Sequence, residues 1–232
     1  MALTDVPFAG VLFDFHSTLI DQGPARERLD LAWKRTGRVP DPVEALGAEQ
    51  VDELTGVLDR IWEHAREIDP GNERDLDLQR HREVFHRLAT RLRTRLPALD
   101  DELTGALHAT LTDTWTPYQD SAPTLHALRG RGLRIAVLSN AGIDIRPVLV
   151  RGGLADLVDA VVVSFEVGLV KPDAAVFRLA LDLIGVPAEQ ALMVGDSWQD
   201  DAAAAALGIR TLLLPRTSGP VHGLDTVLRL VG

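Results

Sequence analysis

From residue 120 onward, short apolar runs alternate with helical stretches, and this alternation constrains the possible fold more than any other feature. Apolar runs that fit buried strands occupy 10–15, 133–138, 160–164, 191–194 and 209–214. Between the later runs, helical stretches cover 121–128, 172–184 and 198–207. Continuous apolar strands alternating with helices are typical of a parallel sheet covered on both faces. We therefore predict an α/β fold.

Residues 22–117 have a different pattern, with apolar residues at helical spacing and no convincing strand. One helix face carries Val51, Leu54, Val57, Leu58 and Ile61, and a second carries Leu76, Val84, Leu88 and Leu92. The 232-residue length suits a core domain with a modest second lobe. We expect residues 1–21 and 118–232 to form the sheet domain, and residues 22–117 to form a helical insert.

Composition excludes several classes of function. The chain has no cysteine, which removes disulfides, thiolate zinc sites and cysteine nucleophiles. Its net charge of −10 repels phosphate backbones and argues against a nucleic acid partner. No basic segment precedes an apolar run at the amino terminus, and no apolar run approaches the roughly 20 residues that cross a bilayer. We expect a cytoplasmic protein with no membrane partner.

Four short segments carry polar side chains at the ends of predicted strands. They are VLFDFHSTL at 11–19, VLSNAG at 137–142, GLVKPDAAVF at 168–177 and MVGDSWQDD at 193–201. Each alone is more often turn or cap chemistry than catalysis. Open parallel sheets bind ligands beyond the carboxyl ends of their strands, so the four segments together predict a phosphate site.

Phosphoryl transfer to a carboxylate needs a nucleophile, a cation and donors for the equatorial phosphate oxygens. Asp14 fits the nucleophile, and Asp14 with Asp196 offers the hard oxygen ligands that Mg²⁺ prefers. Ser139, the backbone at Asn140 and Lys171 can supply the donors. The spacing leaves open whether Asp200 or Asp201 holds a metal-bound water or orients the lysine.

With these four ordered motifs, the chain resembles a haloacid dehalogenase-like hydrolase with a helical cap inserted between its first and second motifs. The resemblance implies a Rossmann-like, doubly wound parallel sheet, an α-helical cap at 22–117, Mg²⁺, an aspartyl-phosphate intermediate and a small phosphorylated metabolite as substrate. It matches Asp14 to the nucleophile, Ser139 to the phosphate-binding hydroxyl, Lys171 to the third-motif lysine and Asp196 to the metal ligand. Asp201 has the commoner spacing for the last acid.

The first motif departs from the family pattern at two positions. His16 stands where the phosphatases carry a general acid and base aspartate, and Ser17 stands where glycine is usual. The backbone carbonyl at this position binds metal in the family, and His16 can supply it. A histidine, with a reference pKa near 6.5, can also protonate a leaving oxygen and then activate water. The alternative is that His16 only fills space.

Three functions remain open at this level. The first is Mg²⁺-dependent hydrolysis of a small phosphate ester or anhydride. The second is a catalytically impaired binding or regulatory protein, and the third is a metal-independent haloacid dehalogenase, a class that also lacks the second aspartate of the first motif. The acids of GDSWQDD favour the phosphatase, because a haloacid site has no evident need for them.

Overall fold

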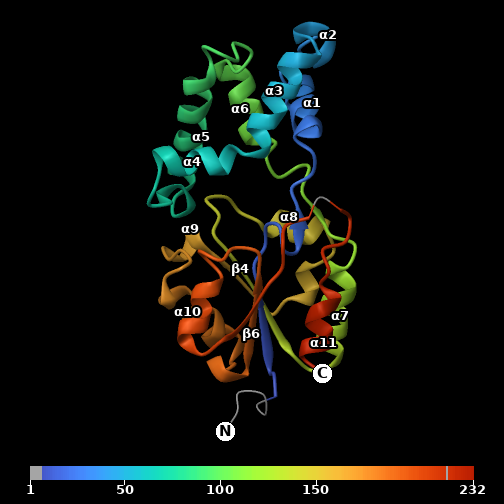
Figure 1. Cartoon of the computed structure of the whole chain (residues 1–232), viewed down its shortest axis with the longest axis vertical. Helices are drawn as coiled ribbons and strands as arrows, with labels where there is room; N and C mark the ends of the chain where they lie inside the picture. The colour runs from blue at the N-terminus through green and yellow to red at the C-terminus, as the bar shows by residue number, and fades with distance from the viewer. Residues whose placement is uncertain (1–6, 218) are drawn as a thin grey trace. The chain divides into compact units, whose positions relative to one another are not determined.

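A computed structural model describes residues 7–217 and 219–232 and divides the chain into two compact units (Figure 1). The first unit comprises Met1–Asp21 and Thr116–Gly232, and the second comprises Gln22–Trp115. No helix among the described residues is both long and apolar enough to cross a membrane.

The first unit is built on a five-stranded parallel sheet with the strand order β5-β4-β1-β6-β7. Its strands are β1 Gly10–Phe13, β4 Arg134–Ser139, β5 Ala160–Val163, β6 Ala191–Gly195 and β7 Arg210–Leu213. The central strand β1 is fully buried, and Phe13 pairs with Val137 on one side and Val194 on the other. The predicted parallel α/β fold is confirmed.

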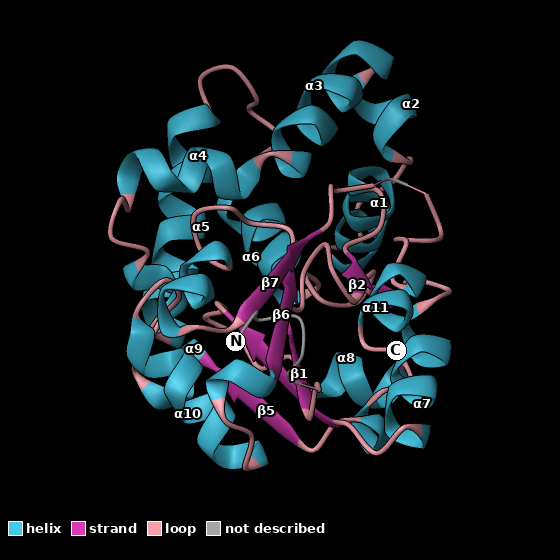
Figure 2. Cartoon of the chain, turned by 60° about the horizontal axis from the view of Figure 1, so that its bottom comes forward, coloured by secondary structure: helices cyan, strands magenta, loops and turns pink. Residues whose placement is uncertain are grey.

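Helices cover both faces of this sheet. They are α7 Ser121–Gly130, α8 Arg146–Arg151, α9 Ser164–Val167, α10 Ala174–Ile184 and α11 Asp225–Leu230. Figure 2 shows the strands in magenta with α10 to one side and α7 to the other. Helix α10 begins where Asp173 accepts a hydrogen bond from the Ala175 amide (2.8 Å) and ends at Gly185, whose φ of 68° is the left-handed conformation that glycine adopts most readily.

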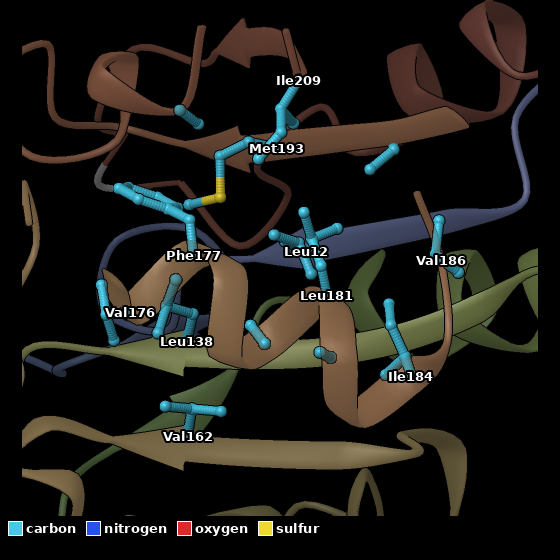
Figure 3. Close-up of a cluster of buried hydrophobic side chains, with 14 residues drawn as sticks. Leu12, Leu138, Val162, Val176, Phe177, Leu181, Ile184, Val186, Met193 and Ile209 are labelled. Carbon is cyan, nitrogen blue, oxygen red and sulfur yellow. The ribbon is translucent and has the colours of Figure 1, made fainter. Parts of the chain in front are cut away.

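The core between α10 and the sheet comes from the alternating side chains of the central strands. Leu12 of β1 and Met193 of β6 lie against Phe177 and Leu181 of α10, and all four are nearly or fully buried (Figure 3). Burying a side chain of this size stabilises the fold by roughly 1.5–3 kcal/mol. This packing fixes the sheet, and therefore the positions at which its strands end.

One predicted helix differs in the structure. The stretch 198–207 contains turns up to residue 201, followed by a 3-10 helix at Ala202–Leu207. The cause lies in Asp201, whose carboxylate accepts hydrogen bonds from the backbone amides of Asp196 (3.2 Å) and Ser197 (3.0 Å). These bonds curl the chain back on itself and delay the helix.

The second unit is helical. It contains α1 Ala25–Arg35, α2 Pro42–Leu46, α3 Ala48–Asp59, α4 Ile61–Ile68, a 3-10 turn at Glu73–Asp75, α5 Leu78–Leu92 and α6 Asp101–Ala109. Helix α1 packs on α3 and α6, and α5 packs on α4 and α6. The apolar face expected at 51–61 is buried throughout, and on the second face Val84 and Leu88 are buried while Leu76 and Leu92 are half-buried. The first unit also contains a short antiparallel pair, β2 Ile20–Asp21 with β3 Thr116–Pro117. In the sequence, β2 directly precedes the second unit and β3 directly follows it.

Candidate active site

The parallel register places three of the four motifs at one edge of the sheet. Asp14 follows β1, Ser139 ends β4 and Asp196 follows β6. The Asp14 amide donates to the Val194 carbonyl (2.8 Å), which continues the pairing of β1 with β6 for one residue. Adjacent parallel strands therefore present these side chains together, at the carboxyl edge where such sheets bind ligands.

Lys171 joins the third motif to this edge through two buried ion pairs. Its Nζ donates to Asp14 Oδ1 and to Asp201 Oδ1, each at 2.6 Å. The lysine side chain is 2% exposed and that of Asp201 is fully buried. A buried ammonium needs such partners, because an uncompensated charge in a protein interior costs several kcal/mol.

The charges of this cluster are shifted by burial and by one another. Burial raises the pKa of Asp14 and of Asp201, and the charge of Lys171 offsets part of that rise. Burial alone would lower the pKa of Lys171, but the two carboxylates outweigh it and raise that pKa above its ordinary value. The lysine therefore stays cationic over the whole working pH range.

Asn140 positions Lys171 through a reciprocal pair of hydrogen bonds. Its amide Nδ2 donates to the Lys171 carbonyl (2.9 Å), and the Lys171 amide donates to Asn140 Oδ1 (2.8 Å). Both ends of the Asn140 side chain thus fasten the third motif to the second. The phosphate contact expected from the sequence was assigned to the Asn140 backbone, which these two bonds do not involve.

Ser139 offers a buried hydroxyl that has no partner. The side chain is 1% exposed, and its Oγ makes no hydrogen bond to any part of the chain that the structure describes. Buried polar groups are normally hydrogen-bonded, and an exception calls for an explanation. A ligand oxygen beside Ser139 would satisfy this hydroxyl, which fits the predicted phosphate-binding role.

Three carboxylates come close enough to share a divalent cation. One ligand oxygen each from Asp14, Asp196 and Asp201 lies within 4.8 Å of the others. Gly195 makes the close approach of Asp201 possible, because a Cβ at that position would lie 2.1 Å from Asp201 Oδ2. An all-oxygen set of carboxylates suits Mg²⁺. The residues present therefore fit the ion that the sequence predicted.

The structure separates the two acids that the sequence left equivalent. Asp201 contacts Lys171, whereas Asp200 Oδ2 accepts a hydrogen bond from the Ser197 hydroxyl (2.9 Å). The Asp200 amide in turn donates to Ser197 Oγ (3.1 Å). Asp201 is thus the acid that lies within the cluster.

Sequence reasoning missed two further contacts. Thr18 Oγ1 donates to Asp14 Oδ2 (3.0 Å), so both oxygens of Asp14 accept hydrogen bonds. Arg216 pairs through Nε with Asp196 Oδ2. Burial raises the pKa of Asp196, and the Arg216 guanidinium counteracts that rise. The sequence held a signal for each contact. Thr18 lies within the first motif, and Arg216 follows the last predicted strand, at the same edge of the sheet as the other site residues.

His16 is a neutral ring in this environment. Burial lowers its pKa to about 3, and the charges of Lys171 and Arg216 act in the same direction. The imidazole is therefore uncharged near pH 7, so it holds no extra proton to give to a leaving group, in contrast to a histidine at the reference pKa.

The turn after His16 explains why glycine suits the next position. Ser17 has a φ of 57°, in the left-handed region that costs an ordinary residue about 1–2 kcal/mol. The turn is closed by the Ser17 amide, which donates to the Ile20 carbonyl (2.9 Å), and by the amides of Leu19 and Ile20, which both donate to the Phe15 carbonyl (3.0 Å each). Serine is accepted here because the loop fixes the backbone.

Comparison with known proteins places this arrangement in context. A family model for haloacid dehalogenase-like hydrolases matches residues 8–208. The phosphoserine phosphatase of Thermus thermophilus is 42% identical over 105 residues, which cover 44% of this chain and 42% of that protein. A (S)-2-haloacid dehalogenase of Pseudomonas fluorescens is 31% identical over 132 residues, covering 55% and 56%. The chain thus aligns with about half the length of these curated relatives.

Solved structures agree on the fold. A phosphatase of the same superfamily from Thermococcus onnurineus superposes with a TM-score of 0.63 at 21% identity, covering 97% of this chain and 98% of that one. At this identity the likeness shows the fold alone. The similarity to both phosphatases and dehalogenases leaves the reaction to be argued from the site.

Proposed function

This chain belongs to the haloacid dehalogenase-like hydrolases, and we propose that it is a Mg²⁺-dependent phosphohydrolase that acts on a small phosphate ester or anhydride through an aspartyl-phosphate on Asp14. The observation that carries the proposal is the group of three carboxylates, Asp14, Asp196 and Asp201, within 4.8 Å of one another. Metal-free displacement of a halide has no need for three acids at one point, whereas a phosphate dianion needs a cation between itself and a carboxylate.

The reaction divides into two displacements at phosphorus. Asp14 attacks the phosphorus, the bond to the leaving oxygen breaks, and that oxygen takes a proton. Water then attacks the same phosphorus, the bond to the Asp14 oxygen breaks, and inorganic phosphate leaves. Lys171 and Thr18 hold the Asp14 carboxylate by its two oxygens, which fixes its orientation. Such positioning removes entropy from the attack.

The remaining groups act on the phosphate oxygens and on the cation. The unpartnered Ser139 hydroxyl donates to one equatorial oxygen, and the backbone at Asn140 to another. Asp14, Asp196 and Asp201 would hold Mg²⁺ together with the His16 carbonyl, and Asp201 also orients Lys171. When bound, the ion neutralises phosphate charge that would otherwise repel Asp14. We assign residues 22–115 the role of a helical cap that selects the substrate.

Substitution of Asp196 tests whether this residue binds the Mg²⁺ that activity is proposed to require. Asp196→Asn should raise the Mg²⁺ concentration for half-maximal phosphatase activity by at least about tenfold, since even outer-shell partners of metal ligands cost 10–100-fold when removed. Asp200→Asn is the matched control, because it makes the same charge change at an acid that pairs with Ser197 and lies outside the group of three carboxylates. Wild-type activity that persists in excess chelator would contradict the metal assignment.

Substitution of His16 tests the source of the leaving-group proton. General acid catalysis contributes about 10²–10⁴ in rate, and it matters most for poor leaving groups such as alkoxides. His16→Asp should therefore raise the ratio of kcat for an alkyl phosphate to kcat for nitrophenyl phosphate by at least about tenfold. The two values of kcat are compared in each protein. His126→Asp, at an exposed histidine of α7, is the control. An unchanged ratio in His16→Asp would show that residue 16 does not reach the leaving oxygen.

A second candidate, haloacid dehalogenase activity, is favoured by one observation. Asp196 is already neutralised by Arg216, so the carboxylates have cationic partners without a metal. In that reaction Asp14 would displace halide from carbon, and water would hydrolyse the resulting ester. Halide release from a 2-haloacid in chelator, compared with phosphate release from an aryl phosphate in Mg²⁺, separates the two candidates.

A further inference from the structure

Arg216 is held beside the carboxylate cluster by the main chain around it. The Leu214 amide donates to the Gly195 carbonyl (2.9 Å), which ties this segment to the residue before Asp196. Farther along, the Tyr118 hydroxyl donates to the Thr217 carbonyl (3.3 Å). The main chain is therefore anchored on both sides of Arg216, which places this residue beside Asp196.

The three carboxylates differ in how their oxygens are used. Asp14 accepts from Lys171 and Thr18, and Asp201 accepts from Lys171 and from two backbone amides. Within the described chain, Asp196 has the Arg216 guanidinium as its one side-chain partner. Asp196 is thus the ligand whose cationic partner is the exposed side chain of Arg216.

The charge of the carboxylate cluster can be balanced either by Arg216 or by a divalent ion. Lys171 neutralises one of the three carboxylate charges, and Arg216 neutralises a second, which leaves a single negative charge. Without Arg216 two negative charges remain, which match a divalent cation. A guanidinium next to a bound Mg²⁺ would also repel it, because like charges a few ångströms apart interact by kilocalories even at partial screening.

The exposures of the two cations show which of them can leave. The Arg216 side chain is 65% exposed, whereas that of Lys171 is 2% exposed. The exposed Arg216 guanidinium can turn toward water, while Lys171 would abandon two buried carboxylates. The 5% exposure of the Asp196 side chain means that this carboxylate needs a cationic partner of one kind or the other.

We propose that Arg216 competes with the divalent cation for Asp196 and thereby sets the metal affinity of the site. The inference rests on the proposed function, since it requires that Asp196 be a metal ligand. Arg216 occupies Asp196 in the metal-free protein, keeps the cluster close to neutral, and yields when Mg²⁺ enters. It acts through Asp196 and so is a positioning residue.

Calorimetric titration with Mg²⁺ alone, without substrate, tests the competition. Arg216→Ala and Arg216→Gln should both lower the Kd for Mg²⁺ by roughly three- to tenfold, a range between that for exposed and buried ion pairs. Arg229→Ala is the matched control, because Arg229 is also 65% exposed and pairs with a carboxylate, Asp225, away from the site. It should leave the Kd unchanged.

The outcomes separate this inference from the proposed function. Binding that is lost in Asp196→Asn but unchanged in both Arg216 variants would overturn the competition and leave the metal site intact. Weaker binding in Arg216→Ala, restored by Arg216→Gln, would also overturn it, because Arg216 would then orient Asp196 by hydrogen bonding. Absence of Mg²⁺ binding in wild type and in both Arg216 variants would overturn the inference and the metal site together.

Discussion

Asp14→Asn is expected to lower phosphatase turnover by at least about 10⁴-fold, because an amide has nearly the shape of the carboxylate but cannot form the acyl phosphate. Its carbonyl oxygen can still accept from Lys171 or from Thr18, so the local geometry should survive. Release of inorganic phosphate from an aryl phosphate in saturating Mg²⁺ measures the effect, and thermal unfolding verifies the fold.

The control for this substitution is Asp200→Asn, which removes the same charge from an acid that pairs with Ser197 rather than with Lys171. It should retain turnover within a few-fold of wild type. Turnover of Asp14→Asn within tenfold of wild type would exclude Asp14 as the nucleophile. An equal loss in both variants would point to net charge rather than to covalent catalysis.

The sheet was predictable because its signal is local and repeated. Each strand of a sheet covered on both faces must be apolar on both sides, and runs such as 133–138 and 191–194 show this directly. The strand ends follow, and with them the common edge of Asp14, Ser139 and Asp196. The prediction of a helix at 198–207 was wrong for residues 198–201, which form turns. The reason is that the Asp201 carboxylate accepts hydrogen bonds from the backbone amides of Asp196 and Ser197.

The finer contacts of the site depend on geometry that spacing does not encode. Adjacent acids at 200 and 201 have the same chemistry, and only the turn after β6 decides which one meets Lys171. Arg216 lies 20 residues beyond Asp196, after β7. The chain has many other arginines, and nothing in the sequence indicates which of them pairs with Asp196. Similarly, the environment of His16 depends on burial and on two distant cations, so its reference pKa was a poor guide.

Replacement of Lys171 should have the largest effect on stability. Lys171→Met keeps the length of the side chain but leaves Asp14 and Asp201 buried without their cation, and breaking a buried pair in this way costs about 3–5 kcal/mol in the free energy of unfolding. Lys34→Met is the matched control, because Lys34 is the chain's other lysine and is exposed. Urea unfolding of both variants and of wild type at pH 8 measures the difference.

The same variant should respond to pH in a defined direction. Burial raises the pKa of Asp14 and Asp201 above 3.8, and Lys171 offsets part of that rise, so the pKa of each should climb further in Lys171→Met. A carboxyl whose pKa is higher in the folded state binds more protons there than in the unfolded chain, at every pH between the two values. Stability is then greatest at low pH and falls as pH rises through that window.

The destabilisation of Lys171→Met relative to wild type should therefore shrink when unfolding is repeated at pH 5, because protonated carboxyls no longer need the ammonium. Lys34→Met should show no such pH-dependent difference from wild type. If Lys171→Met were destabilised equally at pH 5 and pH 8, the loss would come from packing of the lysine stem. If it were as stable as wild type at pH 8, the buried ion pairs would not be what holds the third motif in place.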